Sequence, residues 1–294
     1  MKTLWRVLAV LALVGAIFMT IGFAVGANNH GFYFDEHGLH MFNYTEAMIK
    51  EEDIGVISEI DIDSQSCDIR FVKAETYGFE INSRKENAFT YSVADGKLLI
   101  KEKRSFNFFL FNFGWQPERL IIYLPESAYL DFVSLRNVSG DINIDQLHTK
   151  DLYINQTSGD IKITKLTADD VSVISISGDM KINEIVADKC TLNTTSGDVR
   201  VSNAASKQLR IKVVSGTTEV NGELGYITEI NTTTGDIKLE INGAEQDYNR
   251  QIRTVTGDVI VNGNRNNAGS VDFKATKSLD ITVVTGDVRI NFLR

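Results

Sequence analysis

Cysteine and proline are both scarce in this sequence. The 294 residues include two cysteines, Cys67 and Cys190, whose separation fits no metal-site spacing. Nothing in the sequence supports a disulfide between them, and we expect each to be a small buried residue. The two prolines, Pro117 and Pro125, form no proline-rich stretch, so no linker of that kind divides the chain.

Basic residues are outnumbered, and familiar catalytic motifs are missing. Lysine and arginine total 30 against 39 aspartates and glutamates, which gives a net charge of −9. Nucleic acid is therefore not an expected partner, because binding phosphates requires a basic surface. The sequence contains no GxSxG, P-loop, HExxH or CxxC pattern. We accordingly expect neither enzymatic activity nor a bound cofactor.

Residues 7–27 form a hydrophobic run of 21 residues without a charge. As a helix this run would span about 31 Å, close to the thickness of a bilayer's hydrocarbon core. Lys2 and Arg6 precede it, so the positive-inside rule places residues 1–6 in the cytoplasm and the rest of the chain outside. We predict a single-pass protein of the cell membrane with an uncleaved signal anchor. The alternative is a cleaved signal peptide ending at Val25-Gly26-Ala27. No cysteine comes directly after the run, which excludes a lipoprotein anchor.

Three further regions are predicted after the anchor. Residues 28–55 form a juxtamembrane stalk, residues 56–134 a β-rich cap, and residues 135–294 a series of repeats. Alternation of apolar and polar residues predicts strands throughout the cap. Its stretch SCDIRF resembles the repeat motif, with Cys67 in the glycine position. The stalk contains a group of histidines and acids whose spacing matches no strong metal site, so no metal is expected there: His30, His37, His40, Asp35 and Glu36.

An aromatic insert, residues 105–115, interrupts the cap. It contains five phenylalanines, a leucine and a tryptophan, and it follows Lys101, Lys103 and Arg104. One interpretation is an exposed apolar patch that contacts a membrane or a protein partner. The other is a hairpin packed over the end of the repeats. The candidate contact residues are Phe106, Phe108, Phe109, Phe111, Phe113 and Trp115.

The repeat motif has a fixed period. The stretches SGDINI, SGDIKI, SGDMKI and SGDVRV follow one another at intervals of 19 residues, and two further copies keep the interval. Two looser copies come after spacings of 22 and 29 residues. A fixed period in this range indicates stacked supersecondary units, and a glycine suits a tight corner that needs a positive φ. The structural turn glycines are Gly140, Gly159, Gly178, Gly197, Gly216, Gly235, Gly257 and Gly286.

Each repeat reads as two short strands. After the Gly159 corner, Ile161 and Ile163 share one face, and a second apolar pair precedes the next corner. A polar turn, residues 167–170, separates the two strands. One coil cannot bury its apolar face alone, so we predict an all-β parallel β-solenoid with about 19 residues and two strands per coil, an N-terminal β-rich cap and one transmembrane helix before it. The longer last spacings predict projecting loops at residues 240–255 and 262–278, which are candidate contact sites.

The aspartate after each glycine would form a column of like charges. Carboxylates about 4.8 Å apart repel one another, so something must offset the repulsion. Basic residues two positions later suggest lateral charge compensation, with the aspartate also able to cap its turn. Ca²⁺ bound along the column is the alternative. The predicted charge ladder consists of Asp160, Lys162, Asp179, Lys181, Asp198, Arg200, Asp236, Lys238, Asp287 and Arg289.

These features resemble a known bacterial group. The anchor, the lead-in ending in IIYLP and the SGD coils are similar to the putative-adhesin β-strand-repeat family of envelope proteins. The phenylalanine-rich insert looks like the LiaG-like members, which are encoded with envelope-stress response systems of Gram-positive bacteria. The resemblance covers most of residues 56–294 and implies no catalytic residues. It implies a solenoid fold and a role in sensing or modulating envelope stress.

Three functions follow from these observations. The first is a non-enzymatic, membrane-anchored extracytoplasmic scaffold with an envelope protein as partner. The second is an adhesin or a rod that binds cell-wall glycan, to which Asn193, Thr194, Thr195 and their equivalents Asn231, Thr232 and Thr233 would offer hydrogen bonds. The third is a polysaccharide lyase or hydrolase, which would need acids or bases that break the repeat. We favour the first, because few aromatic residues occur within the repeat to bind a glycan, and because the acids follow the repeat, which argues against an enzyme.

Overall fold

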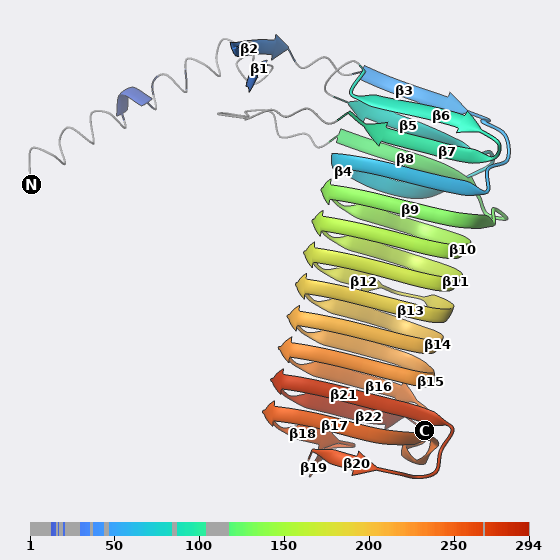
Figure 1. The fold of residues 1–294 in the computed structure, drawn as a ribbon, viewed down its shortest axis with the longest axis vertical. Helices are drawn as coiled ribbons and strands as arrows, with labels where there is room; N and C mark the ends of the chain where they lie inside the picture. The colour runs from blue at the N-terminus through green and yellow to red at the C-terminus, as the bar shows by residue number, and fades with distance from the viewer. Residues whose placement is uncertain are drawn as a thin grey trace, which may run out of the picture.

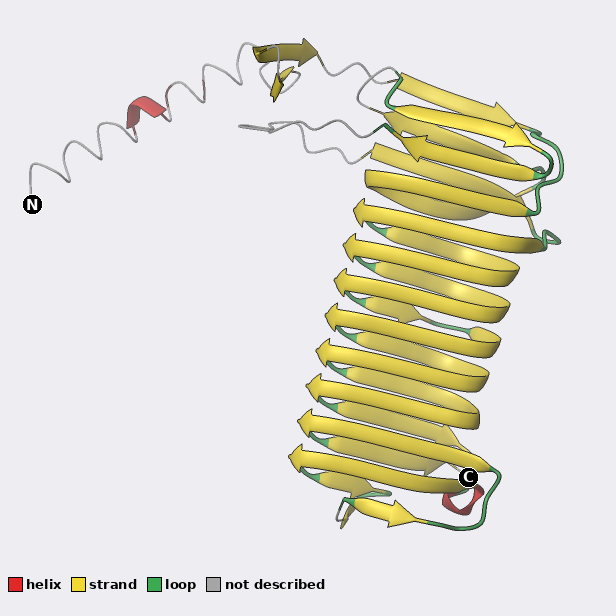
Figure 2. Cartoon of the chain, in the orientation of Figure 1, coloured by secondary structure: helices red, strands yellow, loops and turns green. Residues whose placement is uncertain are grey.

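The fold of this chain is all-β, as the sequence predicts. The computed structural model describes residues 13–15, 17, 20, 30–35, 38–43, 47–83, 87–103, 118–266 and 268–293. Strands make up almost all of this part, with one 3-10 helix, η2 (Glu245–Asp247), near the C-terminal end (Figure 2). Two strands, β1 (His30–Asp35) and β2 (Gly38–Asn43), pair with each other antiparallel.

Two predicted regions fall outside the described residues. The aromatic insert, residues 105–115, lies wholly outside them, and the predicted anchor, residues 7–27, lies largely outside them. Within the described part, no helix has the length and hydropathy that crossing a membrane requires.

Successive repeats pair side by side and parallel, as a ladder of coils (Figure 1). Ile142 pairs with Ile161, and Ile161 with Met180, so each residue meets the one 19 positions later. The period in the sequence is therefore the register of the sheet. The strands of this regular part are β10 (Ile142–Ser158), β11 (Ile161–Ser177), β12 (Met180–Ile182), β13 (Ile185–Ser196), β14 (Val199–Ser215) and β15 (Thr218–Thr234).

Each coil has three straight segments rather than two strands and a turn. Between the corners at Gly159 and Gly178 the ladder is continuous, and residues 167–170, which we predicted as a polar turn, belong to β11. Along β11 the buried positions are Ile161, Ile163, Leu166, Ala168, Val171, Val173 and Ser175. The alternation slips by one residue twice, and the chain bends there. Leu166 therefore forms part of a third inward column.

At the N-terminal end the coils are not stacked in chain order. Strand β4 (Glu59–Ala74) pairs with β10 through Ile69 and Ile142, so Cys67 occupies a glycine corner as the sequence suggests. The chain then leaves the stack and returns on the other side of β4, so that β4 lies between β8 and β10. The outer strands are β3 (Ala47–Glu52), β5 (Gly78–Ser83), β6 (Phe89–Ala94), β7 (Lys97–Glu102) and β8 (Glu118–Pro125), and β9 (Leu130–Ser139) resumes the stack.

The last two coils are stacked in reverse order. The coil of β21 (Lys277–Thr285) and β22 (Val288–Leu293) lies directly on β15 and β16 (Ile237–Asn242). The earlier coil of β17 (Tyr248–Thr256) and β18 (Val259–Val261) lies beyond it. The prediction of projecting loops at residues 240–255 and 262–278 was wrong, since much of both stretches forms strands. The short β19 (Asn264–Asn266) and β20 (Gly269–Val271) pair antiparallel with β18 and β17 at this end.

Both cysteines are buried free thiols, as expected. Burial raises the pKa of Cys190 to about 12 and raises the pKa of Cys67 well above its ordinary value. We therefore expect no reaction with a thiol reagent such as Ellman's reagent at pH 8 in the folded protein, because the reactive thiolate is scarce and shielded. Both thiols should react after unfolding in urea. Rapid modification of either thiol in the folded protein would contradict the buried placement.

Candidate functional site

The eight predicted glycines lie at one corner of the stack. All have positive φ, between 112° and 146°. At Gly178, which has φ 124°, an added Cβ would lie 2.0 Å from the carbonyl oxygen of Gly159 in the neighbouring coil. The corner thus needs glycine both for its backbone conformation and for close stacking. The last three corner glycines do not stack in chain order, because Gly286 lies next to Gly235 and Gly257 lies next to Gly286.

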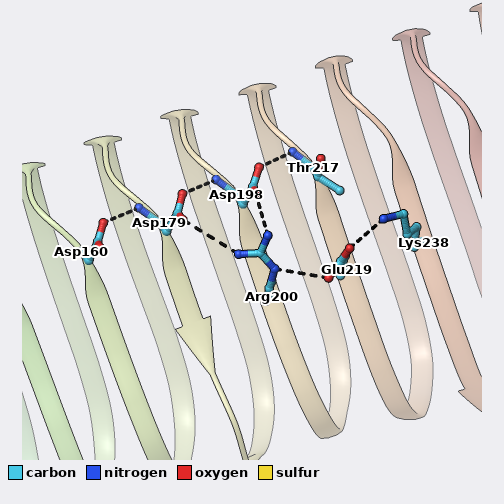
Figure 3. A network of polar contacts seen from close by, with 7 residues as sticks. All are labelled: Asp160, Asp179, Asp198, Arg200, Thr217, Glu219 and Lys238. Atoms are coloured by element: carbon cyan, nitrogen blue, oxygen red, sulfur yellow. Dashed lines mark hydrogen bonds and ion pairs between the residues drawn. The ribbon is translucent and has the colours of Figure 1, made fainter.

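The aspartates that follow these glycines bond to the backbone of the next coil. The Asp198 amide donates to Oδ1 of Asp179 at 2.8 Å, and the Asp179 amide donates to Oδ1 of Asp160 at 2.9 Å (Figure 3). The same bond joins Asp287 to Asp236 and Asp258 to Asp287, both at 2.9 Å. Each carboxylate therefore accepts a charge-assisted hydrogen bond from an amide. This bond offsets part of the repulsion along the column.

Bases join only part of the column. Arg200 lies 2.8 Å from Asp198, 3.9 Å from Asp179 and 3.3 Å from Glu219, measured between guanidinium nitrogens and carboxylate oxygens (Figure 3). Arg289 lies 3.3 Å from Asp287. Lys238 pairs with Glu219 at 2.9 Å instead of with Asp236. Among the ion pairs of the described residues, none includes Lys162 or Lys181. Hydrogen bonds from backbone amides thus compensate the aspartates more regularly than ion pairs do.

Asp179→Ala should lower the free energy of unfolding by about 1–3 kcal/mol, because it leaves the Asp198 amide without its acceptor. Asp179→Asn keeps a side-chain oxygen at that place, and we expect a clearly smaller loss. Urea unfolding of both variants measures the difference. If the two variants were equally unstable, the carboxylate charge and not the amide bond would be what matters.

Glu219 occupies the position at which the adjacent coils carry a base. It forms ion pairs with both of those bases, Arg200 and Lys238. The hydrogen bond from Lys238 lowers the pKa of the Glu219 carboxyl, Arg200 adds to the shift, and partial burial opposes it. A lowered folded-state pKa stabilises the fold above the ordinary carboxyl pKa of about 4.3, and this stability is lost as the pH falls through the folded value.

We expect Glu219→Gln to destabilise the protein by less than about 1 kcal/mol at pH 7, because the pair is partly exposed. The difference from the unmodified protein should disappear on acidification below the folded-state pKa. Thermal melts over a descending pH series from pH 7 test this, and a difference that stayed constant throughout the series would contradict it.

A second polar column lies inside the corner, and the sequence did not reveal it. Gln156 is fully buried, and its amide nitrogen donates to the Gly140 carbonyl at 2.6 Å and the Ser158 carbonyl at 3.1 Å. Ser175 and Thr194 bond to corner carbonyls in the same way. Thr194 and Thr232 are buried, so the prediction that these two side chains offer hydrogen bonds to a glycan was wrong. The signal was a polar residue three positions before six of the eight glycines, with Val213 and Val283 at the other two.

No metal cluster is visible among the residues that the structure describes: no three His, Cys, Asp or Glu side chains lie close enough together to hold an ion. The candidate contact residues of the aromatic insert, Phe106, Phe108, Phe109, Phe111, Phe113 and Trp115, lie outside the described ranges.

Comparisons with known proteins identify a family. The Toastrack DUF4097 profile matches residues 57–291. No curated protein matches the chain significantly. A solved putative adhesin from Bacteroides fragilis is 16% identical with a TM-score of 0.46, over 84% of this chain and 98% of that one.

Two solved proteins from Parabacteroides distasonis are also similar. One, a putative adhesin, is 11% identical with a TM-score of 0.45, over 84% of this chain and 98% of its own. The other, a putative lipid binding protein, is 13% identical with a TM-score of 0.36, over 84% and 97%. At these values the similarities carry no conclusion about function.

Proposed function

This chain belongs to the Toastrack DUF4097 family, and we propose that it is a non-enzymatic interaction protein of the cell envelope. Residues 7–27 would anchor it in the cell membrane, with residues 1–6 inside and the rest outside. The stack of coils would then present long, regular faces to extracytoplasmic molecules.

A non-enzymatic role is supported by the hydrogen bonds that the aspartate column accepts. Six of its carboxylates accept amide hydrogen bonds from the adjacent coil: Asp141, Asp160, Asp179, Asp198, Asp236 and Asp287. A general acid or base needs a group free to exchange a proton with a substrate. These acids instead bind neighbouring coils together, which is a structural task.

Two kinds of partner agree with the proposal. An adhesin would use the outward faces of the coils to hold an extended polymer such as cell-wall glycan. A scaffold would use the aromatic insert, residues 105–115, to contact another envelope protein or the membrane. We retain the closer resemblance to LiaG-like proteins, and with it a role in the envelope stress response, as part of the scaffold alternative.

Photo-crosslinking in cells tests the proposal. A crosslinking amino acid is placed at Phe109 in the insert and, separately, at Lys181, which is exposed on a coil. A membrane-protein adduct at Phe109 would support the scaffold, and wall-glycan adducts at Lys181 would support the adhesin. Adducts restricted to cytoplasmic proteins at both positions would contradict a location and role in the envelope.

A further inference from the structure

A groove with a volume of about 440 Å³ runs along the stack over the middle segment of each coil and the bend that follows that segment. Three regular coils contribute equivalent residues, 167–169, 186–188 and 205–207. Beyond them the groove continues over Glu223, Gly225 and Tyr226 of β15 and reaches Lys277 of β21. Five neighbouring coils therefore line it. At about 4.8 Å per coil the groove is about 19 Å long.

The repeat is broken inside this groove. Ser206 pairs with Leu224, but Gln208 pairs with Ile227, so β15 contains one extra residue opposite Lys207. Such a bulge redirects the side chain of the added residue. Tyr226 lies in the bulge and is 59% exposed. Gly225 permits the close approach, because an added Cβ there would lie 2.3 Å from the Ser206 carbonyl oxygen.

Aromatic side chains occur at both ends of this surface. His148 pairs in register with Thr167, one coil before the groove begins. The Tyr129 ring packs edge-to-face against His148, with ring centroids 4.8 Å apart, and Tyr129 is 47% exposed. From the coil of His148 to that of Tyr226 there are four coil spacings, or about 19 Å. Between them the outward row of the lining consists of Thr167, Val186 and Ala205, and the inward row beside it consists of Ala168, Ala187 and Ser206.

The charges of the groove are mixed and mostly paired. Lys207 Nζ lies 2.6 Å from Asp188 Oδ1, and Lys277 Nζ lies 3.9 Å from Glu223 Oε1. A strongly anionic polymer would meet Asp169, Asp188 and Glu223, and a strongly cationic one would meet both lysines. The lining therefore favours a neutral ligand that has many hydroxyl groups to exchange hydrogen bonds with these side chains.

We propose that this groove binds a neutral oligosaccharide that lies along the axis of the stack. The apolar face of one sugar ring packs on Tyr226, and the other end of the oligosaccharide lies near Tyr129 and His148. Tyrosine offers a large apolar face with a polar tip, which suits a sugar ring. The inference rests on the proposed envelope function and specifies its adhesin form.

Calorimetric titration of the full-length chain in lipid nanodiscs tests this inference, with cellohexaose and chitohexaose as neutral probes. We expect at least one of them to bind. Tyr226→Ala and Tyr129→Ala should each weaken binding by about tenfold, the equivalent of one aromatic contact. Tyr153→Ala, on an outward strand position away from the groove, serves as the matched control and should leave binding unchanged. Because Tyr226 is exposed, its replacement should leave the melting temperature nearly unchanged.

Three outcomes would overturn the inference: no binding of either probe, binding that both groove variants retain, or tighter binding of an anionic oligogalacturonate. The envelope function is tested separately by retention of the protein on isolated cell-wall fragments. If the unmodified chain is retained there but binds neither hexasaccharide, the groove proposal fails alone. Absence of retention together with absence of envelope adducts would remove the proposed function as well.

Discussion

Gly178→Ala is expected to lower the free energy of unfolding by more than about 4 kcal/mol, at the upper end of single-residue effects. The added Cβ would lie 2.0 Å from the Gly159 carbonyl oxygen and 2.6 Å from its carbon. Both atoms belong to the backbone of the neighbouring coil, so the clash can be relieved only if the two coils move apart. The positive φ adds its own cost for an L side chain. Urea unfolding followed by circular dichroism measures the loss.

Gly263→Ala is the matched control for Gly178→Ala. Gly263 also has positive φ, at 76°, but an added Cβ there would have no atom within 4 Å. Its replacement should therefore cost only the conformational part, about 1–2 kcal/mol. If the two variants lost equal stability, the close contact between stacked corners would not be the reason that glycine recurs.

Tyr248→Ala is expected to cost about 3–5 kcal/mol, because it empties a large site in the terminal coil. Tyr248 is fully buried, its ring lies 5.7 Å from that of Phe292, and its hydroxyl donates to the Leu224 carbonyl at 2.9 Å. We expect the reversed pair of coils to loosen, so that a protease cuts between residues 243 and 293 before the regular coils are attacked. Limited proteolysis read by mass spectrometry locates the cuts.

Tyr248→Phe separates packing from hydrogen bonding at this position. It keeps the ring and removes only the hydroxyl, so about 1 kcal/mol should be lost and the protease pattern should stay that of the unmodified chain. A loss as large as that of Tyr248→Ala would show that the bond to Leu224, and not the filled volume, holds the terminal coil.

The regular coils were predictable because one number, the 19-residue period, also fixes the register of the sheet. The stacking order of the end coils was not predictable. Spacings of 22 and 29 residues give only the length of chain between corners, not which coil stacks on which. That order is set by tertiary contacts, such as the bond from the Asp287 amide to Asp236, 51 residues earlier. The third inward column, which includes Leu166, was missed because its alternation slips by one residue at each bend.

The candidate sites also depend on contacts that the sequence does not reveal. The sequence indicates that the aspartates need compensation, but their partner is a backbone amide, which every residue has and no motif reveals. The Tyr226 bulge is hidden for a different reason. Between Gly216 and Gly235, β15 first skips one residue relative to β14 and later gains one, so the 19-residue interval is preserved. A period measured from corner to corner cannot detect changes that cancel within one coil.

The reversed order of the last coils determines how the stack bears mechanical load. Residues Val288, Arg289 and Ile290 of β22 have paired strands on both edges, β16 on one side and β18 on the other. Tension applied at Leu293 would first meet residues 291–293, which pair with β16 alone, and would then reach the three residues that are paired on both edges. In a stack wound in simple chain order, the same tension would peel away an outermost strand one bond at a time. The reversed order therefore adds, at residues 288–290, a second row of hydrogen bonds that such a stack would lack.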